Sequence, residues 1–225
     1  FDLVVVPRHD RLRGDNVVTT RGALHRVTGE RLRRAADEFA ADVAALPRPL
    51  VAVLVGGDNG VYRLGPDQAR DLGSKLGALA RSGAGLAVTP SRRTGASNER
   101  ILRDALAGLP AVVWDGGGAN PYFGYLGLAD AIVVTCDSVS MVSEAVSTGK
   151  PVYIFDLPGG SDKFRAFHAG FRADGFTRPL ADALASGALD PWTYAPPDDT
   201  AMVAAEVLRR LSLNSASGDR NDAYP

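Results

Sequence analysis

Residues 130–150, DAIVVTCDSVSMVSEAVSTGK, carry the pattern that decides the fold. The apolar run Ala131–Thr135 is typical of a buried strand, and it passes through a short polar turn into a helix that ends before Gly149. Ser138 or Ser140 can cap the start of that helix with a side-chain hydroxyl. A strand, a turn and a helix in this order form the building unit of a parallel β-sheet.

Further apolar runs lie on both sides of this segment, and helical patterns separate them. The runs predict strands at Leu50–Val55, Leu86–Thr89, Ala111–Trp114 and Val152–Phe155. The helical patterns lie at Pro66–Ala80, Asn98–Ala107 and Ser161–Arg172. A further short helix is expected to open at an Asn120-Pro121 cap and to end near Gly127. This alternation predicts the α/β fold class with a Rossmann-like parallel sheet.

The predicted organisation has four parts. The strand Leu3–Pro7 and the amphipathic stretch Glu30–Leu46 stand apart from the alternation, so we interpret them as the end of an N-terminal domain and its connector. The boundaries are 1–48 for this part, 49–195 for the Rossmann-like domain, 196–213 for a terminal helix and 214–225 for a disordered tail. Because the chain opens inside an apolar run without Met, we expect N-terminal residues of a longer polypeptide to be missing.

The composition is that of an ordinary globular protein and excludes several classes. With 25 Lys and Arg against 26 Asp and Glu, the net charge is −1, so the chain lacks the basic footprint of nucleic-acid binding. The single cysteine, Cys136, excludes an internal disulfide and a multi-cysteine metal site. No apolar run is long enough to be a transmembrane segment. We therefore expect a cytoplasmic protein, with peripheral membrane contact left open.

In an open parallel sheet the ligand lies at the carboxyl ends of the strands, so the loops there are the candidate site. In the first loop, Gly57 and Asn59 could bring the backbone close to a phosphate or ribose, although a tight turn with positive φ would explain the glycines equally well. In the next loop, Arg92 or Arg93 could pair with an anion, whereas paired surface arginines are often only solvated.

The turn after Thr135 is the strongest candidate, since it enters a helix whose exposed amides and dipole favour an anion. Ser138 and Ser140 add hydroxyl donors to this turn. Glu144 follows Ser140 by four residues, on the same helix face, where its carboxylate could accept the hydroxyls of a ribose. The alternative for Glu144 is a simple interaction with the helix dipole.

Catalytic candidates are fewer. His9 and Asp10 follow the strand Leu3–Pro7, so either could act as a general base toward an acceptor hydroxyl, although polar residues in loops often have no such role. Cys136 follows a buried strand directly and is interpreted as a small hydrophobe. The histidines lack companions at ligand spacing, so no metal site is expected.

Several of these segments together resemble known families. The C-terminal domain of GT-B-fold enzymes is similar at Pro121–Leu126, Ala129–Ala131, Asp137-Ser138, Glu144-Ala145 and Gly149–Val152. More closely, the chain resembles the mitochondrial fission (elongated-mitochondria) family and its bacterial homologues at Ser91–Thr94, Asn120–Tyr122 and Thr135–Met141. This similarity extends over most of residues 1–180.

The resemblance implies the C-terminal domain of a GT-B-like fold with the end of its N-terminal domain. It implies that Glu144 holds a ribose, that Ser138, Val139, Ser140 and Met141 hold a diphosphate, and that Asn120 and Tyr122 line the cleft. The implied activity is that of a metal-independent glycosyltransferase whose small-molecule donor is a nucleotide-diphosphate sugar, without a further cofactor. The alternatives are an epimerase or hydrolase of the same donor, and a non-catalytic adaptor of the fission family.

Overall fold

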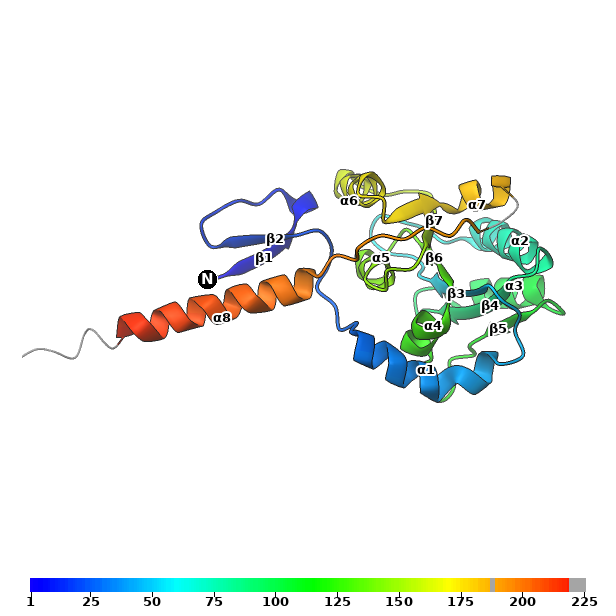
Figure 1. Ribbon diagram of the computed structural model, residues 1–225. Coiled ribbons are helices and arrows are strands. Elements are labelled where there is room, and N and C mark those ends of the chain that lie inside the picture. The colour runs from blue at the N-terminus through cyan, green and yellow to red at the C-terminus, as the bar shows by residue number, and fades with distance from the viewer. Residues whose placement is uncertain (187–188, 219–225) are drawn as a thin grey trace, which may run out of the picture.

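Six parallel strands form the central sheet of the computed structural model, which describes residues 1–186 and 189–218 (Figure 1). Their spatial order is β5-β4-β3-β6-β7-β8. The strands are β3 Leu50–Val55, β4 Gly85–Pro90, β5 Ala111–Val113, β6 Ala131–Thr135, β7 Val152–Phe155 and β8 Thr177–Pro179. This is the strand order of a doubly wound sheet, in which successive strands are added outward in both directions from a central pair, here β3 and β6. The predicted α/β fold with a Rossmann-like parallel sheet is confirmed.

The central strands are buried because helices cover both faces of the sheet. Every residue of β3, β4 and β6 is buried, as expected for strands of a parallel sheet. On one face lie α2 Pro66–Arg81 and α3 Ala96–Leu106, and on the other α4 Tyr122–Leu128 and α5 Val139–Val146 (Figure 1). Next in the chain come α6 Asp162–Ala173 and α7 Leu180–Ser186. Helix α6 packs into the core through Phe167 and Phe171, which are each 1% exposed.

Helix α1, Gly29–Val43, packs against α4. Two glycines of α4 allow the close approach: a Cβ on Gly124 would lie 2.7 Å from the ring of Phe39, and one on Gly127 would lie 2.6 Å from the carbonyl oxygen of Leu32. The sequence placed this stretch in a connector that precedes the Rossmann-like domain. In the structure its apolar side instead completes the covering of that domain (Figure 1).

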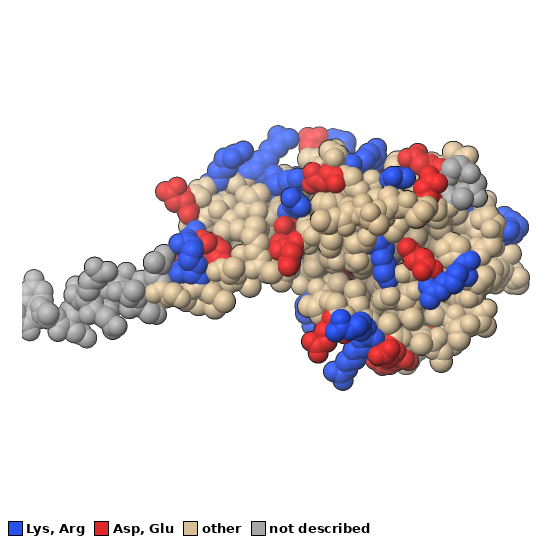
Figure 2. Space-filling view, viewed as in Figure 1, with Lys and Arg blue, Asp and Glu red and all other residues tan. Residues whose placement is uncertain are grey.

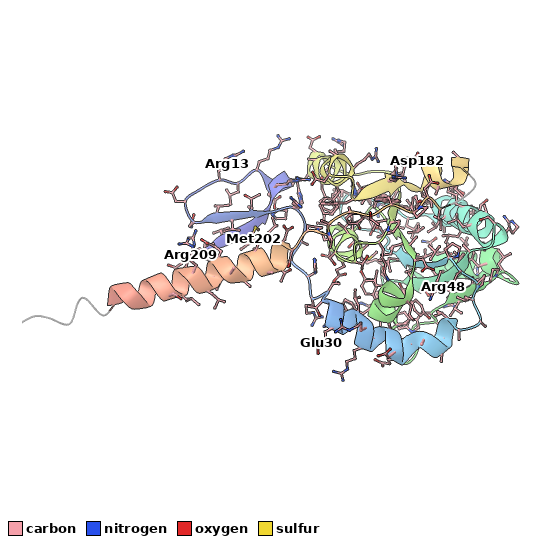
Figure 3. All side chains as sticks on the ribbon, viewed as in Figure 1. Arg13, Glu30, Arg48, Asp182, Met202 and Arg209 are labelled. Atoms are coloured by element: carbon pink, nitrogen blue, oxygen red, sulfur yellow. The ribbon has the colours of Figure 1, made fainter. Side chains whose placement is uncertain are left out.

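A second, two-stranded parallel sheet lies beside the C-terminal helix. It is formed by β1 Val4–Pro7 and β2 Val17–Thr20, and the 3₁₀ helix η1, Arg8–Asp10, follows β1 directly. Helix α8, Asp199–Gly218, runs along this sheet, where Arg210 donates to the carbonyl oxygens of Asp2 (2.9 Å) and Asp15 (3.1 Å) (Figures 1 and 3). The first and last parts of the chain therefore meet at a distance from the central sheet.

Some boundaries differ from those predicted. Helix α8 extends to Gly218, so residues 214–218 are helical rather than part of the predicted tail, whose remainder lies outside the described residues. The helix predicted to open at an Asn120-Pro121 cap begins at Tyr122 instead, with Asn120 Oδ1 accepting from the Tyr122 amide (3.0 Å). The short elements β2, β8 and α7 were not predicted, because three to seven residues carry too little periodicity.

Charged side chains of both signs are interspersed over the face of the molecule seen in Figure 2. This distribution is in keeping with the net charge of −1. No helix within the described ranges is both long enough and apolar enough to cross a membrane.

Candidate functional site

The candidate site lies where β3 and β6 run side by side. From this pair the sheet is built outward in opposite directions, through β4 on one side and β7 on the other. In open α/β sheets the loops after such a pair of strands diverge, so a ligand crevice is expected at the carboxyl ends of β3 and β6. We call residues 56–60, after β3, and residues 136–138, after β6, the switch-point loops.

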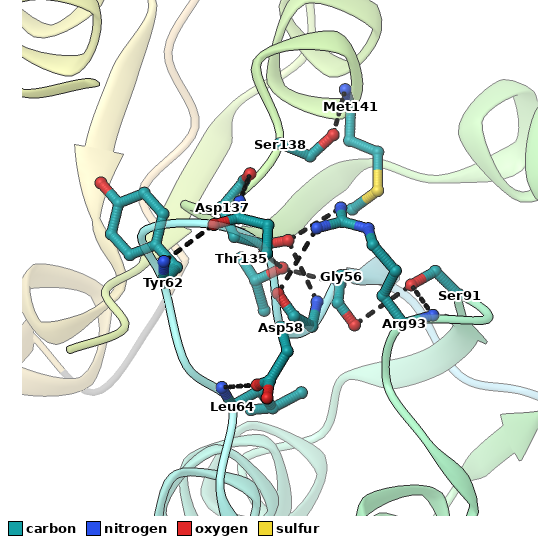
Figure 4. A network of polar contacts seen from close by, with 12 residues as sticks. Gly56, Asp58, Tyr62, Leu64, Ser91, Arg93, Thr135, Asp137, Ser138 and Met141 are labelled. Atoms are coloured by element: carbon teal, nitrogen blue, oxygen red, sulfur yellow. Dashed lines mark hydrogen bonds and ion pairs between the residues drawn. The ribbon is translucent and has the colours of Figure 1, made fainter. Parts of the chain in front are cut away.

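A buried carboxylate joins the switch-point loops to each other. The Asp137 side chain is 0% exposed and accepts from the Gly57 amide at Oδ2 (3.0 Å) and from the Thr135 hydroxyl at Oδ1 (2.6 Å) (Figure 4). The guanidinium of Arg93, from the loop after β4, lies 2.9 Å from Oδ2. Sequence reasoning did not select Asp137, although a carboxylate directly after a buried strand was a usable signal.

Close packing explains the glycines that begin the first loop. A Cβ on Gly57 would lie 1.9 Å from the Arg93 carbonyl oxygen, and one on Gly56 would lie 2.2 Å from Asp137 Oδ2. Neither residue is among the glycines with positive φ, so backbone conformation does not require glycine here. The Gly56 amide donates to the Thr135 hydroxyl (2.8 Å), and the Gly57 amide donates to Asp137. Both amides therefore already have acceptors within the protein.

Asn59 also holds its loop in shape. Its Oδ1 accepts from the amides of Val61 and Tyr62, both at 2.8 Å, and its Nδ2 donates to the Asp137 carbonyl (2.8 Å). A ligand role for Gly57 and Asn59 stays a prediction. Any ligand that bound there would contact loops that hydrogen bonds already join.

The two arginines after β4 differ in their surroundings. The Arg93 side chain is 39% exposed, so its guanidinium bridges from the buried Asp137 to the solvent-facing side of the crevice. Arg92 is exposed, and no side-chain hydrogen bond or ion pair involves it within the described ranges. Arg93 is therefore the arginine that the fold positions at the switch-point loops.

The start of α5 presents unpaired amides at the same crevice. Ser138 is the N-cap, and its hydroxyl accepts from the Met141 amide (3.3 Å), which decides between the two predicted caps. The amides of Val139 and Ser140 lie in the first turn of the helix, where no helical carbonyl is placed to accept from them, so they remain available to an anion. The Ser140 side chain is exposed. These groups lie in the turn for which the sequence predicts anion binding, and that role stays a prediction.

Glu144 is fixed by a tyrosine from a different helix. Tyr122, the first residue of α4, donates its hydroxyl to Glu144 Oε2 at 2.6 Å. Burial first, and then the neighbouring Glu144 charge, raise the pKa of Tyr122 well above its ordinary value, so the tyrosine stays a donor. Glu144 is the sixth of eight residues in α5, beyond the first turn where a carboxylate benefits from the helix dipole. The structure therefore disfavours the dipole interpretation of Glu144.

The short helix α4 that carries Tyr122 is itself held at its C-terminal end. Lys150 Nζ donates to the last carbonyls of the helix, those of Leu126 (2.6 Å) and Gly127 (2.7 Å). Burial lowers the pKa of Lys150 to about 8. With α1 packed along its side, α4 places the Tyr122 hydroxyl reproducibly against α5.

The two catalytic candidates contact α6. Asp10 Oδ1 pairs with Lys163 (2.8 Å), and the His9 ring packs edge-on against Phe167 at 5.3 Å between centroids. His168, next along α6, donates from Nε2 to the Cys136 carbonyl (2.8 Å) at the end of β6. The structure therefore places His9 and Asp10 against α6, whose His168 contacts the end of β6, and a catalytic role for either stays a prediction.

We expect the protein to lose stability as the pH falls below neutrality. The Nδ1 atoms of His9 and His168 are buried without a hydrogen-bond partner in the described part of the chain. Burial lowers the pKa of both rings below the ordinary 6.5, an effect that the Asp10 carboxylate partly offsets for His9. The unfolded chain therefore binds more protons below pH 6.5, so this stability is complete above that pH and is lost as the pH falls through the folded pKa values.

Urea unfolding measured from pH 7 downward checks this expectation. The double variant His9→Gln/His168→Gln keeps an amide that can donate to the Cys136 carbonyl and removes the titrating rings, so its stability should vary less with pH. An equal slope in both proteins would contradict the assignment.

Other chemistries find little support in the described residues. No group of three or more His, Cys, Asp or Glu side chains there could hold a metal ion. Cys136 is 2% exposed, and burial raises the pKa of its thiol to about 11, as expected for an inert hydrophobe. The candidate site thus consists of a helix start with available amides, an arginine paired with the buried Asp137, and a carboxylate whose second oxygen has no partner among the described residues.

The fold defines a doubly wound α/β protein whose candidate site lies at the switch point of the sheet. Residues 1–211 match the family described as mitochondrial fission ELM1, so the chain belongs to that family. The family predicted from the sequence motifs is confirmed.

Two curated relatives have similar sequences. The mitochondrial fission protein ELM1 of Arabidopsis thaliana is 37% identical over 242 residues, which cover 96% of this chain and 56% of the relative. The uncharacterized protein RP120 of Rickettsia prowazekii is 27% identical over 214 residues, covering 93% of this chain and 59% of the relative. The chain therefore spans somewhat more than half the length of these relatives.

Solved structures share only part of the fold. A glycosyl transferase family 9 structure from Veillonella parvula has a TM-score of 0.38 and 11% identity, over 60% of this chain and 38% of that one. YcaC from Pseudomonas aeruginosa has a TM-score of 0.42 and 15% identity, over 60% and 77%. Both likenesses are partial, and neither assigns an activity to this chain.

Proposed function

We propose that the chain is the nucleotide-binding part of a metal-independent glycosyltransferase whose donor is a nucleotide-diphosphate sugar. The observation that carries the proposal is the Tyr122–Glu144 hydrogen bond of 2.6 Å, which leaves Glu144 Oε1 free of protein partners among the described residues. A carboxylate held in this way can accept a hydrogen bond from a ribose hydroxyl.

The start of α5 supports the diphosphate part of the proposal. Its free amides lie on the helix that carries Glu144, one to two turns away, a spacing that suits a diphosphate attached to a ribose. Arg93 adds a positive charge at the same crevice. These groups would also stabilise the negative charge that develops on a leaving diphosphate, which removes the need for a metal ion.

In this proposal His9 or Asp10 acts as the base toward an acceptor. Both residues lie in η1, directly after β1 of the two-stranded sheet and outside the Rossmann-like unit. The lowered pKa keeps His9 neutral and able to accept a proton. Because the chain spans little more than half of its curated relatives, the activity of the whole protein is part of this proposal.

A thermal-shift screen with UDP, GDP, CDP and ADP tests the nucleotide site. A ligand at 100 times its Kd stabilises the folded state by about 2.7 kcal/mol, or roughly 5–10 °C for a chain of this size. Glu144→Ala should reduce the shift caused by the preferred nucleotide to near zero. Glu99→Ala, which removes a carboxylate from the first turn of α3, is the matched control and should respond like the wild type.

The outcome also separates the alternatives. If no nucleotide shifts the wild-type midpoint, the glycosyltransferase proposal fails, as do the epimerase and hydrolase alternatives. A non-catalytic binding or adaptor protein of the fission family then becomes the better description. If a nucleotide binds, incubation with the matching nucleotide sugar distinguishes hydrolysis or epimerisation from transfer.

A further inference from the structure

A groove outside the switch-point loops lies between the flank of α1 and the start of α4. Its volume is about 630 Å³, and it is lined by Arg26, Arg31 and Arg34 together with the Asn120 amide and the Phe123 ring. Glu30, labelled in Figure 3, marks its position on the first turn of α1. In Figure 2, basic side chains stand beside acidic ones over this helix.

The groove has an excess of unpaired positive charge. Within residues 1–186 and 189–218, no carboxylate lies at ion-pair distance from Arg26, Arg31 or Arg34. Two carboxylates, Glu30 and Glu38, also line the groove, four residues before and after Arg34 on α1. Three arginines against two glutamates leave a net charge of +1 in the groove. The two glutamates lie at helical spacing from Arg34, whereas neither lies at that spacing on α1 from Arg31.

Arg31 is oriented by two contacts. Its guanidinium stacks over the Phe123 ring, 4.1 Å from the centroid, which fixes the plane and leaves the N–H groups at its edge free. Its backbone amide donates to the Thr28 hydroxyl (3.1 Å), the N-cap of α1. The positive end of the dipole of this 15-residue helix thus lies at the groove as well.

We propose that this groove binds the phosphate or diphosphate group of a second substrate, the acceptor of the sugar. Planar guanidinium groups with free edges match phosphate oxygens, and Ala35, Phe39 and Ala119 provide an apolar wall for an uncharged part of the same molecule. Asn120 connects the groove to the donor site, since it lies two residues before Tyr122, which holds Glu144. The role as acceptor site rests on the proposed function, whereas the anion binding does not.

Calorimetric titration with inorganic pyrophosphate at low ionic strength tests the groove, because exposed charges are screened at high salt. The double variant Arg26→Ala/Arg31→Ala should bind pyrophosphate at least tenfold more weakly than the wild type. Arg33→Ala is the matched control, because it removes the same charge from an exposed position of α1 that does not line the groove. The control should stay within twofold of the wild type, and Arg93→Ala should keep the pyrophosphate binding that depends on Arg26 and Arg31.

Three results would overturn the inference: no pyrophosphate binding by the wild type, wild-type affinity in the double variant, or loss of binding in Arg93→Ala alone, which would place the anion at the switch-point loops. Circular dichroism of each variant ensures that a loss of binding is not a loss of fold. If pyrophosphate binding depends on Arg26 and Arg31 while no nucleoside diphosphate binds, the groove is an anion site and the proposed function is wrong. If nucleotide binding depends on Glu144 and the groove does not bind pyrophosphate, the inference about the groove is wrong and the proposed function is unaffected.

Discussion

Gly57→Ala is expected to lower the free energy of unfolding by more than about 4 kcal/mol, the range of severe overpacking and strain. The added methyl carbon would lie 1.9 Å from the Arg93 carbonyl oxygen and 2.7 Å from the Thr94 amide nitrogen. Both atoms belong to backbone, so no side-chain rotation can relieve the contact. The loop after β3 and the loop after β4 would have to separate, which would also break the contacts around Asp137.

Gly60→Ala is the matched control for this substitution. Gly60 belongs to the same loop, and a Cβ there would meet nothing within 4 Å. Urea denaturation of both variants measures the difference, provided the slope of the transition stays unchanged. A Gly57→Ala protein as stable as Gly60→Ala would show that the loops do not approach as closely as described.

Asp137→Ala is expected to destabilise the fold by about 3 kcal/mol, because it leaves buried donors without a partner. The Gly57 amide and the Thr135 hydroxyl lose their acceptor, and Arg93 loses its only carboxylate in the described ranges. Asp137→Asn should be milder, since one amide oxygen can still accept from a loop donor.

Asp67→Ala provides the comparison for the loss of a carboxylate in general. Asp67 pairs with Arg70 at the surface, its side chain is 85% exposed, and such pairs contribute little. The thermal midpoint of the Asp67→Ala variant should stay close to that of the wild type, whereas the midpoint of Asp137→Ala should fall by roughly 6–12 °C. Equal midpoints in the two variants would refute the role given to Asp137.

The sheet could be predicted from the sequence because its signal is local. The runs that become β3, β6 and β7 are four to six apolar residues bounded by Gly, Pro or Asp, and their burial follows from that pattern. The start of α5 was also predictable, since a capping serine and an open turn need only neighbouring residues.

The connections between distant segments were not predictable in the same way. Glu144 could be read as a ribose ligand or as a dipole partner, and only the position of Tyr122 on a neighbouring helix separates these interpretations. Gly57 was taken for a ligand-approach or turn glycine, while its crowding against the Arg93 carbonyl arises from a loop 36 residues further on.

The sequence by itself determined an α/β protein with a parallel sheet, a serine-capped start to α5 and membership of the fission family. The tertiary structure alone decided that Asp137 ties three loops together, that α1 covers α4, and that Arg31 and Phe123 share a groove. The physical reason is the range of the forces. Periodicity and capping act over a few residues, whereas contacts among loops depend on strand order, which brings together residues far apart in the chain.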